Sequence, residues 1–222
     1  MKDRKKLIIA ILAVLTIIVL VGGATFAYWT WVTNTAQQTN VSFVLEDKDL
    51  EGEMYAKLEG NGTTTATSLK PATCNGSNAI VKTITIKYLN KTVQAATVSA
   101  TLSVTAFTAR SASYLPSSTN LGYLKYALTT DSSSCTSNVQ KSGSFNGLTF
   151  SSAVTPTNLP LTLFTQTFTA SANMSAEGTQ TYYLYIWLDS SYEHTNTGSV
   201  NSDPMQGLSF TTQWSGTIAQ NS

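Results

Sequence analysis

The sequence predicts an all-β protein, an antiparallel β-sandwich or jelly roll, preceded by an N-terminal hydrophobic signal helix. Apolar side chains recur at every second position in several segments, which is the period of a strand with one buried face. Beyond the leader, no segment has the pattern of a convincing helix. Only 11% of the 222 residues are charged, and the abundant Thr suits the surface of strands.

The leader has the three parts of a secretory signal. Residues 2–6 are basic apart from one acid, residues 7–21 are apolar, and a Gly- and Ala-containing exit ends at Ala27. This pattern predicts a signal peptide over residues 1–27, cleaved between Ala27 and Tyr28. The alternative is a retained transmembrane helix, because the apolar stretch is long enough to cross a bilayer. Both interpretations place the rest of the chain outside the cytoplasm.

Removing the leader leaves 195 residues with nine basic and eleven acidic side chains, a net charge of −2. This length is enough for one domain with a real core, expected over residues 41–222. A nearly neutral chain offers no basic surface for nucleic acid. We expect contact with a membrane only through an uncleaved leader.

Most of the expected strands alternate apolar with polar side chains. The expected strands are residues 28–33, 41–45, 54–58, 79–89, 95–107, 121–130, 145–150, 161–170, 182–188 and 208–214. The period of two is longest over residues 95–107, where Val98, Ala100, Leu102, Val104 and Ala106 are expected to face the core. Residues 182–188 are apolar on both faces, so this strand is expected at the centre of its sheet.

The first expected strand lies at the new N-terminus that cleavage would create. Trp29 and Trp31 share one of its faces, and a polar linker follows up to residue 40. A tethered strand of this kind can pair with its own sheet or with the open edge of a neighbouring copy. Residues 28–40 are therefore the candidate assembly segment.

Cys74 and Cys135 are the only two cysteines. A single disulfide is the natural expectation in an oxidising compartment. Closing a loop of about 60 residues would contribute up to ~4 kcal/mol to stability. The alternative is two separate thiols, because the sequence does not show that the two residues are close.

Few residues point to catalysis, and we expect that the protein is not an enzyme. His194, the only histidine, lies in a polar loop where a solvated side chain is expected. The sequence has no zincin motif, phosphate-binding loop or nucleophile elbow. No cofactor is expected. The alternative is a calcium ion bound at one of two groups of acidic residues. The first group is Glu46, Asp47, Asp49, Glu51 and Glu53, and the second is Asp189, Glu193 and Asp203.

Both ends of the chain resemble a known family. Residues 21–30 read VGGATFAYWT, which is similar to the signal exit of the TasA/camelysin family, and residues 208–214 resemble that family's final strand. The resemblance implies a secreted jelly-roll subunit, cut by a SipW-type signal peptidase, that self-associates into biofilm-matrix fibres by donating its N-terminal strand. The two cysteines depart from the family pattern. No zinc motif supports the metalloprotease label that some camelysin relatives carry.

The expected function is therefore that of an extracellular structural subunit of a fibre or matrix. The alternative is a membrane-anchored surface adhesin or binding module that retains its N-terminal helix. The two differ in whether Tyr28 becomes the N-terminus.

Overall fold

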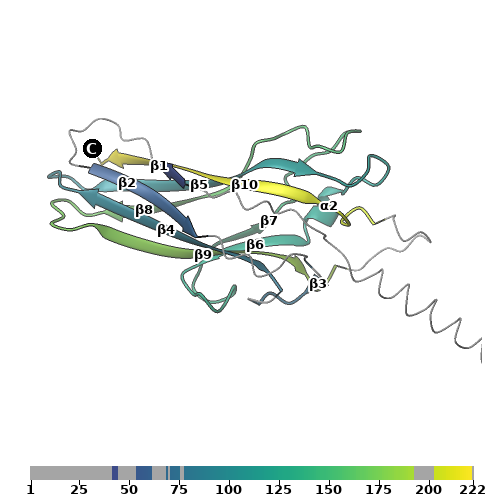
Figure 1. The fold of residues 1–222 in the computed structure, drawn as a ribbon, viewed down its shortest axis with the longest axis horizontal. Coiled ribbons are helices and arrows are strands. Elements are labelled where there is room, and N and C mark those ends of the chain that lie inside the picture. Colours follow the sequence, from purple (N-terminus) through teal and green to yellow (C-terminus); the bar gives the residue numbers. More distant parts are fainter. Residues whose placement is uncertain are drawn as a thin grey trace, which may run out of the picture.

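The computed structural model describes residues 42–44, 54–61, 69, 71–75, 78–192 and 203–221. These residues form an all-β structure of two mostly antiparallel sheets with one short helix (Figure 1). The leader, the expected cleavage site at Ala27 and Tyr28, and the expected strand with Trp29 and Trp31 lie outside the described residues. Among the helices of the described part, none is long and apolar enough to cross a membrane.

The larger sheet has seven strands. Six of them form a continuous order, β1 (Ser42–Val44), β2 (Met54–Asn61), β4 (Ile80–Asn90), β9 (Gly178–Asp189), β6 (Leu124–Thr129) and β7 (Val139–Ser144). The seventh, the two-residue strand β3 (Pro71–Ala72), pairs in parallel with the end of β9. Strand β9 therefore lies between β4 and β6, as the apolar residues on both of its faces predicted.

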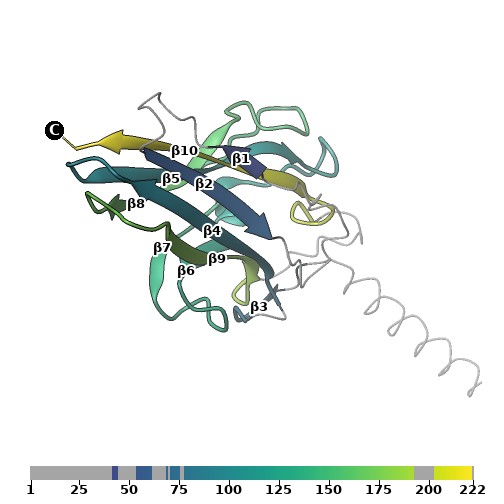
Figure 2. The ribbon, with the colours of Figure 1, turned by 60° about the vertical axis from the view of Figure 1, so that its left-hand side comes forward.

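The smaller sheet has three strands in the order β10 (Ser209–Gln220), β5 (Ala96–Thr108) and β8 (Leu161–Ala170). Strand β5 is central and pairs with both neighbours over most of its length. Strands β10 and β8 are the two edges. Figure 2 shows this sheet lying across the larger one.

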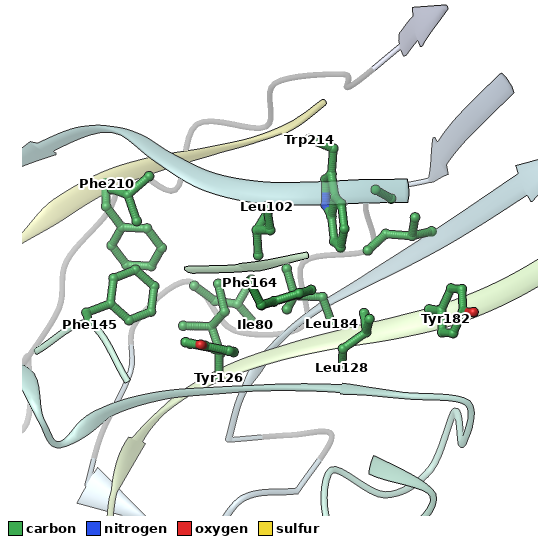
Figure 3. Close-up of a cluster of buried hydrophobic side chains, with 14 of the residues drawn as sticks. Ile80, Leu102, Tyr126, Leu128, Phe145, Phe164, Tyr182, Leu184, Phe210 and Trp214 are labelled. Atoms are coloured by element: carbon green, nitrogen blue, oxygen red, sulfur yellow. The ribbon is translucent and has the colours of Figure 1, made fainter. Parts of the chain in front are cut away.

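One hydrophobic cluster contains buried side chains from both sheets, so the two sheets face each other across a common core. Phe164 of β8 lies near its centre (Figure 3). Its ring stacks on Tyr126 of β6 with centroids 5.3 Å apart and meets the edge of Trp214 of β10 at 5.5 Å. These aromatic contacts add to the area that the rings bury and join the two sheets.

The strongest strand predictions are confirmed. Strands β4, β5, β8 and β9 lie where the alternation placed residues 79–89, 95–107, 161–170 and 182–188, within one residue at most ends and with β9 extending further. Strands β2 and β10 begin near the expected positions but continue to Asn61 and Gln220. The extension of β10 carries mostly polar or small residues, and this had hidden its length.

One strand prediction is confirmed except at its start. The expected strand over residues 121–130 begins only at Leu124, because residues 118–121 form the short helix α2 (Ser118–Leu121). Ser117 caps this helix through a capping box with Asn120, a local interaction that favours a helical turn. The expectation of no helix beyond the leader is corrected by the same element.

The expected strand over residues 145–150 is absent, and the preceding residues form β7 instead. Phe145 is buried in the core, but it follows the strand and its backbone turns away. Strand β7 escaped prediction because its side chains are polar and mostly exposed, so the edge of the sheet imposes no apolar alternation.

One expected core position on β5 is also wrong. Val98, Ala100, Leu102 and Val104 are buried, but Ala106 is exposed. The register against β10 shifts at Thr105, which has no partner there. A bulge inserts one residue and so moves the following side chains to the other face. Phe107 takes the buried position in place of Ala106.

Candidate assembly surface

The smaller sheet contains no charged residue and no proline in any of its three strands. Natural sheets usually protect their edges with Lys, Pro, bulges or very short strands, because an unpaired edge can bind another chain. Within the described residues, the outer edges of β8 and β10 pair with no strand. Both strands are also long. The smaller sheet therefore has two edges without charged or proline protection.

The edges of the larger sheet differ. Strand β1 has three residues, which offers little backbone for pairing. Strand β7 carries the exposed cation Lys141 and has a register shift opposite Thr129. Short length and a lysine are among the usual means of blocking an edge. The bulge does not separate the two sheets, because β8 has one as well, at Leu163. An added strand is therefore expected on the smaller sheet rather than on the larger one.

From Phe164 onward, strand β8 alternates between core and solvent. Phe164 and Gln166 are buried, whereas Thr165 and Thr167 are exposed. Gln166 is a buried polar residue, and its Nε2 donates to the backbone carbonyl of Thr167 at 3.4 Å. The side chain of Gln166 also hydrogen-bonds Tyr182 of β9, which partly offsets the rise that burial causes in the pKa of Tyr182.

One end of β8 is fixed to the larger sheet. Leu163 is a bulge residue with no partner on β5. The hydroxyl of Tyr126 donates to its backbone carbonyl at 3.0 Å, so the acceptor freed by the bulge is satisfied. Gly143 of β7 makes room for this contact, because a Cβ there would lie 2.5 Å from the Tyr126 hydroxyl. Burial raises the pKa of Tyr126 above its ordinary value.

Apolar side chains remain partly exposed along β8. Leu161, Leu163 and Phe168 pack against the core but are only half-buried. Phe168 also contacts Tyr88 of β4 at a centroid distance of 4.9 Å. A strand added beside β8 with apolar residues on its inner face would cover this surface, which favours association by the hydrophobic effect.

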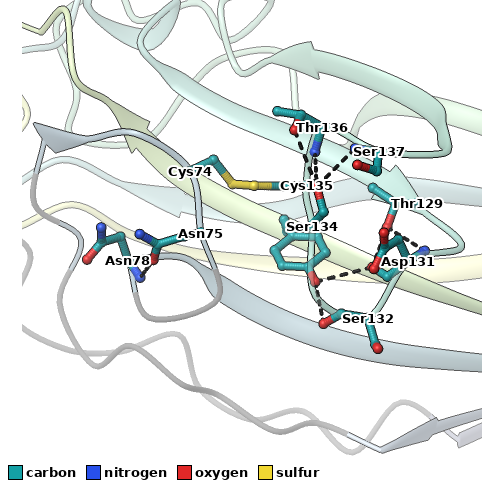
Figure 4. Close-up of a disulfide and its surroundings, with 11 residues drawn as sticks. Cys74, Asn75, Asn78, Thr129, Asp131, Ser132, Ser134, Cys135, Thr136 and Ser137 are labelled. Carbon is teal, nitrogen blue, oxygen red and sulfur yellow. Dashed lines mark hydrogen bonds between the residues drawn. A yellow bond between two sulfur atoms is a disulfide. The ribbon is translucent and has the colours of Figure 1, made fainter.

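Cys74 and Cys135 are joined by a disulfide in the structure, with their Cα atoms 6.3 Å apart, and this expectation is confirmed (Figure 4). The bond ties two loops over the outer face of the larger sheet. Beneath them lies a second small cluster that includes Ala79, Ala127 and Tyr185. Tyr185 is fully buried although it lies on the outward face of β9, because these loops cover it.

The loop that follows β6 is held by hydrogen bonds as well as by the disulfide. The hydroxyl of Tyr185 donates to the carbonyls of Ser132 at 2.7 Å and Asp131 at 3.3 Å. Burial raises the pKa of Tyr185 above its ordinary value, and the Asp131 charge adds to this shift. The Asp131 carboxylate accepts from the backbone and side chain of Ser133, which lowers its pKa. These contacts make the loop a fixed cover for this face.

The residues considered for catalysis and metal binding are only partly described. His194, Glu193 and the acidic residues 46–53 lie outside the described part of the chain. Asp189 accepts from the hydroxyl and backbone of Ser191, which lowers its pKa. Asp203 is buried and accepts from the Tyr192 hydroxyl at 2.8 Å and from a backbone N–H. Over the described ranges, no three His, Cys, Asp or Glu residues come together in a group that could hold a metal ion.

Sequence reasoning missed the candidate acceptor strand, β8. It concentrated on Trp29 and Trp31 as the donor and did not single out a strand that could receive them. The signal was available, because residues 161–170 alternate without a charge or a proline. The bulge at Leu163 and its bond to Tyr126 could not be found this way, since they join strands that are distant in the sequence.

No protein-family model matches this chain, and neither the curated proteins nor the solved structures include a significant match.

Proposed function

We propose that this protein is a secreted structural subunit of an extracellular fibre or biofilm matrix and that it is not an enzyme. The observation that carries the proposal is the long, uncharged edge strand β8, left without a partner in the described part of the chain. The resemblance of the signal exit to the TasA/camelysin family supports export and cleavage by a SipW-type signal peptidase. On this proposal the two facing sheets are a β-sandwich of the jelly-roll type.

The assembly step is addition of residues 28–33 of one copy to β8 of the next. Strand addition obtains its affinity from main-chain hydrogen bonds and its specificity from alternate side chains. Trp29 and Trp31 would face inward and cover the half-buried Leu161, Leu163 and Phe168. Thr30 would then lie on the outer face, beside the β8 threonines.

The choice of β8 over β10 follows from the position of β1, the described strand that comes after the donor segment in the sequence. Strand β1 begins at Ser42 and pairs with β2, and β2 approaches β10. Strand β8 is the opposite edge of the smaller sheet and approaches β7. A donor on one side and an acceptor on the other give a head-to-tail contact, the kind of contact from which a linear fibre is built when its rotation does not close into a ring.

Electron microscopy of the exported protein tests the proposal. The intact protein should form fibres as its concentration rises, and a variant lacking residues 28–33 should form none. A Thr167→Pro variant on the edge strand β8 should also lose fibres. The control is Ser142→Pro on β7, which is also an edge strand, and this variant should still assemble. Thr181→Pro would not serve as a control, because β9 is central in its sheet. Fibres formed equally well by the deletion variant would show that strand donation is wrong.

The alternative is a membrane-anchored adhesin or binding module with the leader retained. N-terminal sequencing of material from the host separates the two functions. A chain that starts at Tyr28 supports the exported subunit, and an intact leader on all surface material supports the anchored module.

A further inference from the structure

The outer face of the smaller sheet is a regular array of small, uncharged polar side chains. Twelve outward positions lie in four rows across the strands, and ten of them carry a hydroxyl group; they are Thr97, Ser99, Thr101 and Ser103 of β5, Thr162, Thr165, Thr167 and Thr169 of β8, and Gln213, Ser215, Thr217 and Ala219 of β10. The β8 and β10 members are exposed and the β5 members half-buried. This set is called the hydroxyl face below.

Cross-strand hydrogen bonds hold parts of this face in a fixed arrangement. The hydroxyl oxygens of Thr101 and Thr165 are 2.9 Å apart, and those of Ser103 and Thr162 are 3.3 Å apart. Thr97 donates to the side chain of Asn221 at 2.7 Å. Side chains that are already ordered lose little further entropy when another surface covers them.

The outer face of the larger sheet is built differently. Lys57 and Lys87 are opposite each other in the register of β2 and β4, and Lys125 lies on β6. The disulfide-linked loops cover the cluster around Tyr185. A contact between two copies through this face would have to cover these charged side chains, which is costly unless each of them is paired across the contact.

We propose that the hydroxyl face binds the hydroxyl face of a second copy, and that this contact joins fibres side by side. A surface without charge does not repel its own copy, and each hydroxyl both donates and accepts, so the face is complementary to itself. Small side chains allow two sheets to approach closely, as between the paired sheets of a steric zipper. This contact uses a face, whereas the proposed fibre contact uses an edge.

The area of the hydroxyl face sets the affinity expected between two copies. Three strands spaced ~4.8 Å apart, paired over residues 96–104 of β5, give a patch of about 400 Å² and a contact of roughly 800–1,000 Å² between two copies. This is near the lower limit for a specific interface. One pair of copies should therefore associate weakly and reversibly. Repetition of the contact along two fibres would raise the total affinity by avidity.

A charge placed at the centre of the face tests the proposal. Thr101→Lys puts a cation on the middle strand, and Thr217→Lys puts one at an exposed position of β10 in case the first variant folds poorly. The control is Thr85→Lys, because Thr85 is also a half-buried, outward threonine on an inner strand, but of the larger sheet. Thermal unfolding of each protein establishes that it is folded.

Sedimentation velocity of the exported proteins, with electron microscopy of any fibres, gives the readout. The unaltered protein and Thr85→Lys should show concentration-dependent dimers and bundled fibres. Thr101→Lys and Thr217→Lys should weaken the dimer by about tenfold or more through like-charge repulsion and leave the fibres single. Mixing Thr101→Lys with Thr101→Glu should restore the dimer, because the two charges then attract.

The result separates this proposal from the fibre proposal. If the deletion of residues 28–33 leaves fibres unaffected but the lysines still abolish the dimer, strand donation fails and the face contact stands. The face contact is overturned if the unaltered protein shows no dimer at any concentration and its fibres are never bundled, or if Thr85→Lys disrupts association as much as Thr101→Lys does.

Discussion

Removing the disulfide should destabilise the protein by an amount that its sequence separation sets. Cys74 and Cys135 are 61 residues apart. Closing a loop of that size lowers the entropy of the unfolded chain and so raises its free energy by roughly 4 kcal/mol. The perturbation is the double change of Cys74→Ser, at the half-buried position, and Cys135→Ala, at the buried one. Guanidinium unfolding of the oxidised protein and of the variant gives the difference in free energy of unfolding.

We expect a loss of about 2–4 kcal/mol, since unfolded chains retain some structure and the entropic value is an upper estimate. The unaltered protein under reducing conditions is the matched control and should unfold at nearly the same denaturant concentration as the variant. Tyr185→Phe should cost about 1 kcal/mol in the oxidised protein, because the hydroxyl bonds to the tethered loop. A loss below about 1 kcal/mol in the double variant would refute the reasoning that the bond constrains the fold.

Three further predictions concern the core and the acidic turn. Phe164→Ala should lower the free energy of unfolding by about 3–5 kcal/mol, because it leaves a cavity between the sheets. Thr165→Ala, on the exposed side, should change the free energy of unfolding by less than ~0.5 kcal/mol. Equal losses in the two variants would contradict the assigned alternation. Tyr126→Phe should cost about 1–2 kcal/mol, because it leaves the bulge carbonyl of β8 without its donor, and an unchanged unfolding midpoint would contradict this. The folded pKa of Asp189 is lowered by Ser191, so its contribution to stability is present above the ordinary pKa of ~3.9 and is lost as the pH falls through the lower folded value. Ser191→Ala should raise the pKa of Asp189 and reduce that acid-dependent loss; an NMR titration that finds no rise would refute the assignment.

The sequence was sufficient to predict the strands with one buried and one exposed face. Residues 79–89, 95–107 and 161–170 alternate because every second side chain contacts the core, and the apolar positions are the ones that face it. The prediction that residues 182–188 are central is confirmed for the same reason, since a strand covered on both faces is apolar on both.

The remaining features depend on contacts between distant residues. The exposed strand β7 has no apolar alternation, and the helix at residues 118–121 arises from capping by Ser117 rather than from periodicity. The displacement of Ala106 by Phe107 follows from a bulge that only the pairing with β10 defines. The candidate assembly edge needed both the sequence and the structure. The sequence predicted β8 as a strand, but only the sheet order shows that it lies at an edge.

Cross-linking between copies tests the central claim most directly. One protein carries Thr30→Cys in the proposed donor strand, and a second carries Thr165→Cys, Thr167→Cys or Thr169→Cys on β8, where outward side chains of neighbouring strands would be close enough for a disulfide. Thr85→Cys on the larger sheet is the control. After mixing and mild oxidation, we expect a covalent dimer with at least one of the β8 variants and none with the control. Equal cross-linking to Thr85→Cys, or none to any β8 position in samples that contain fibres, would contradict assembly through this edge.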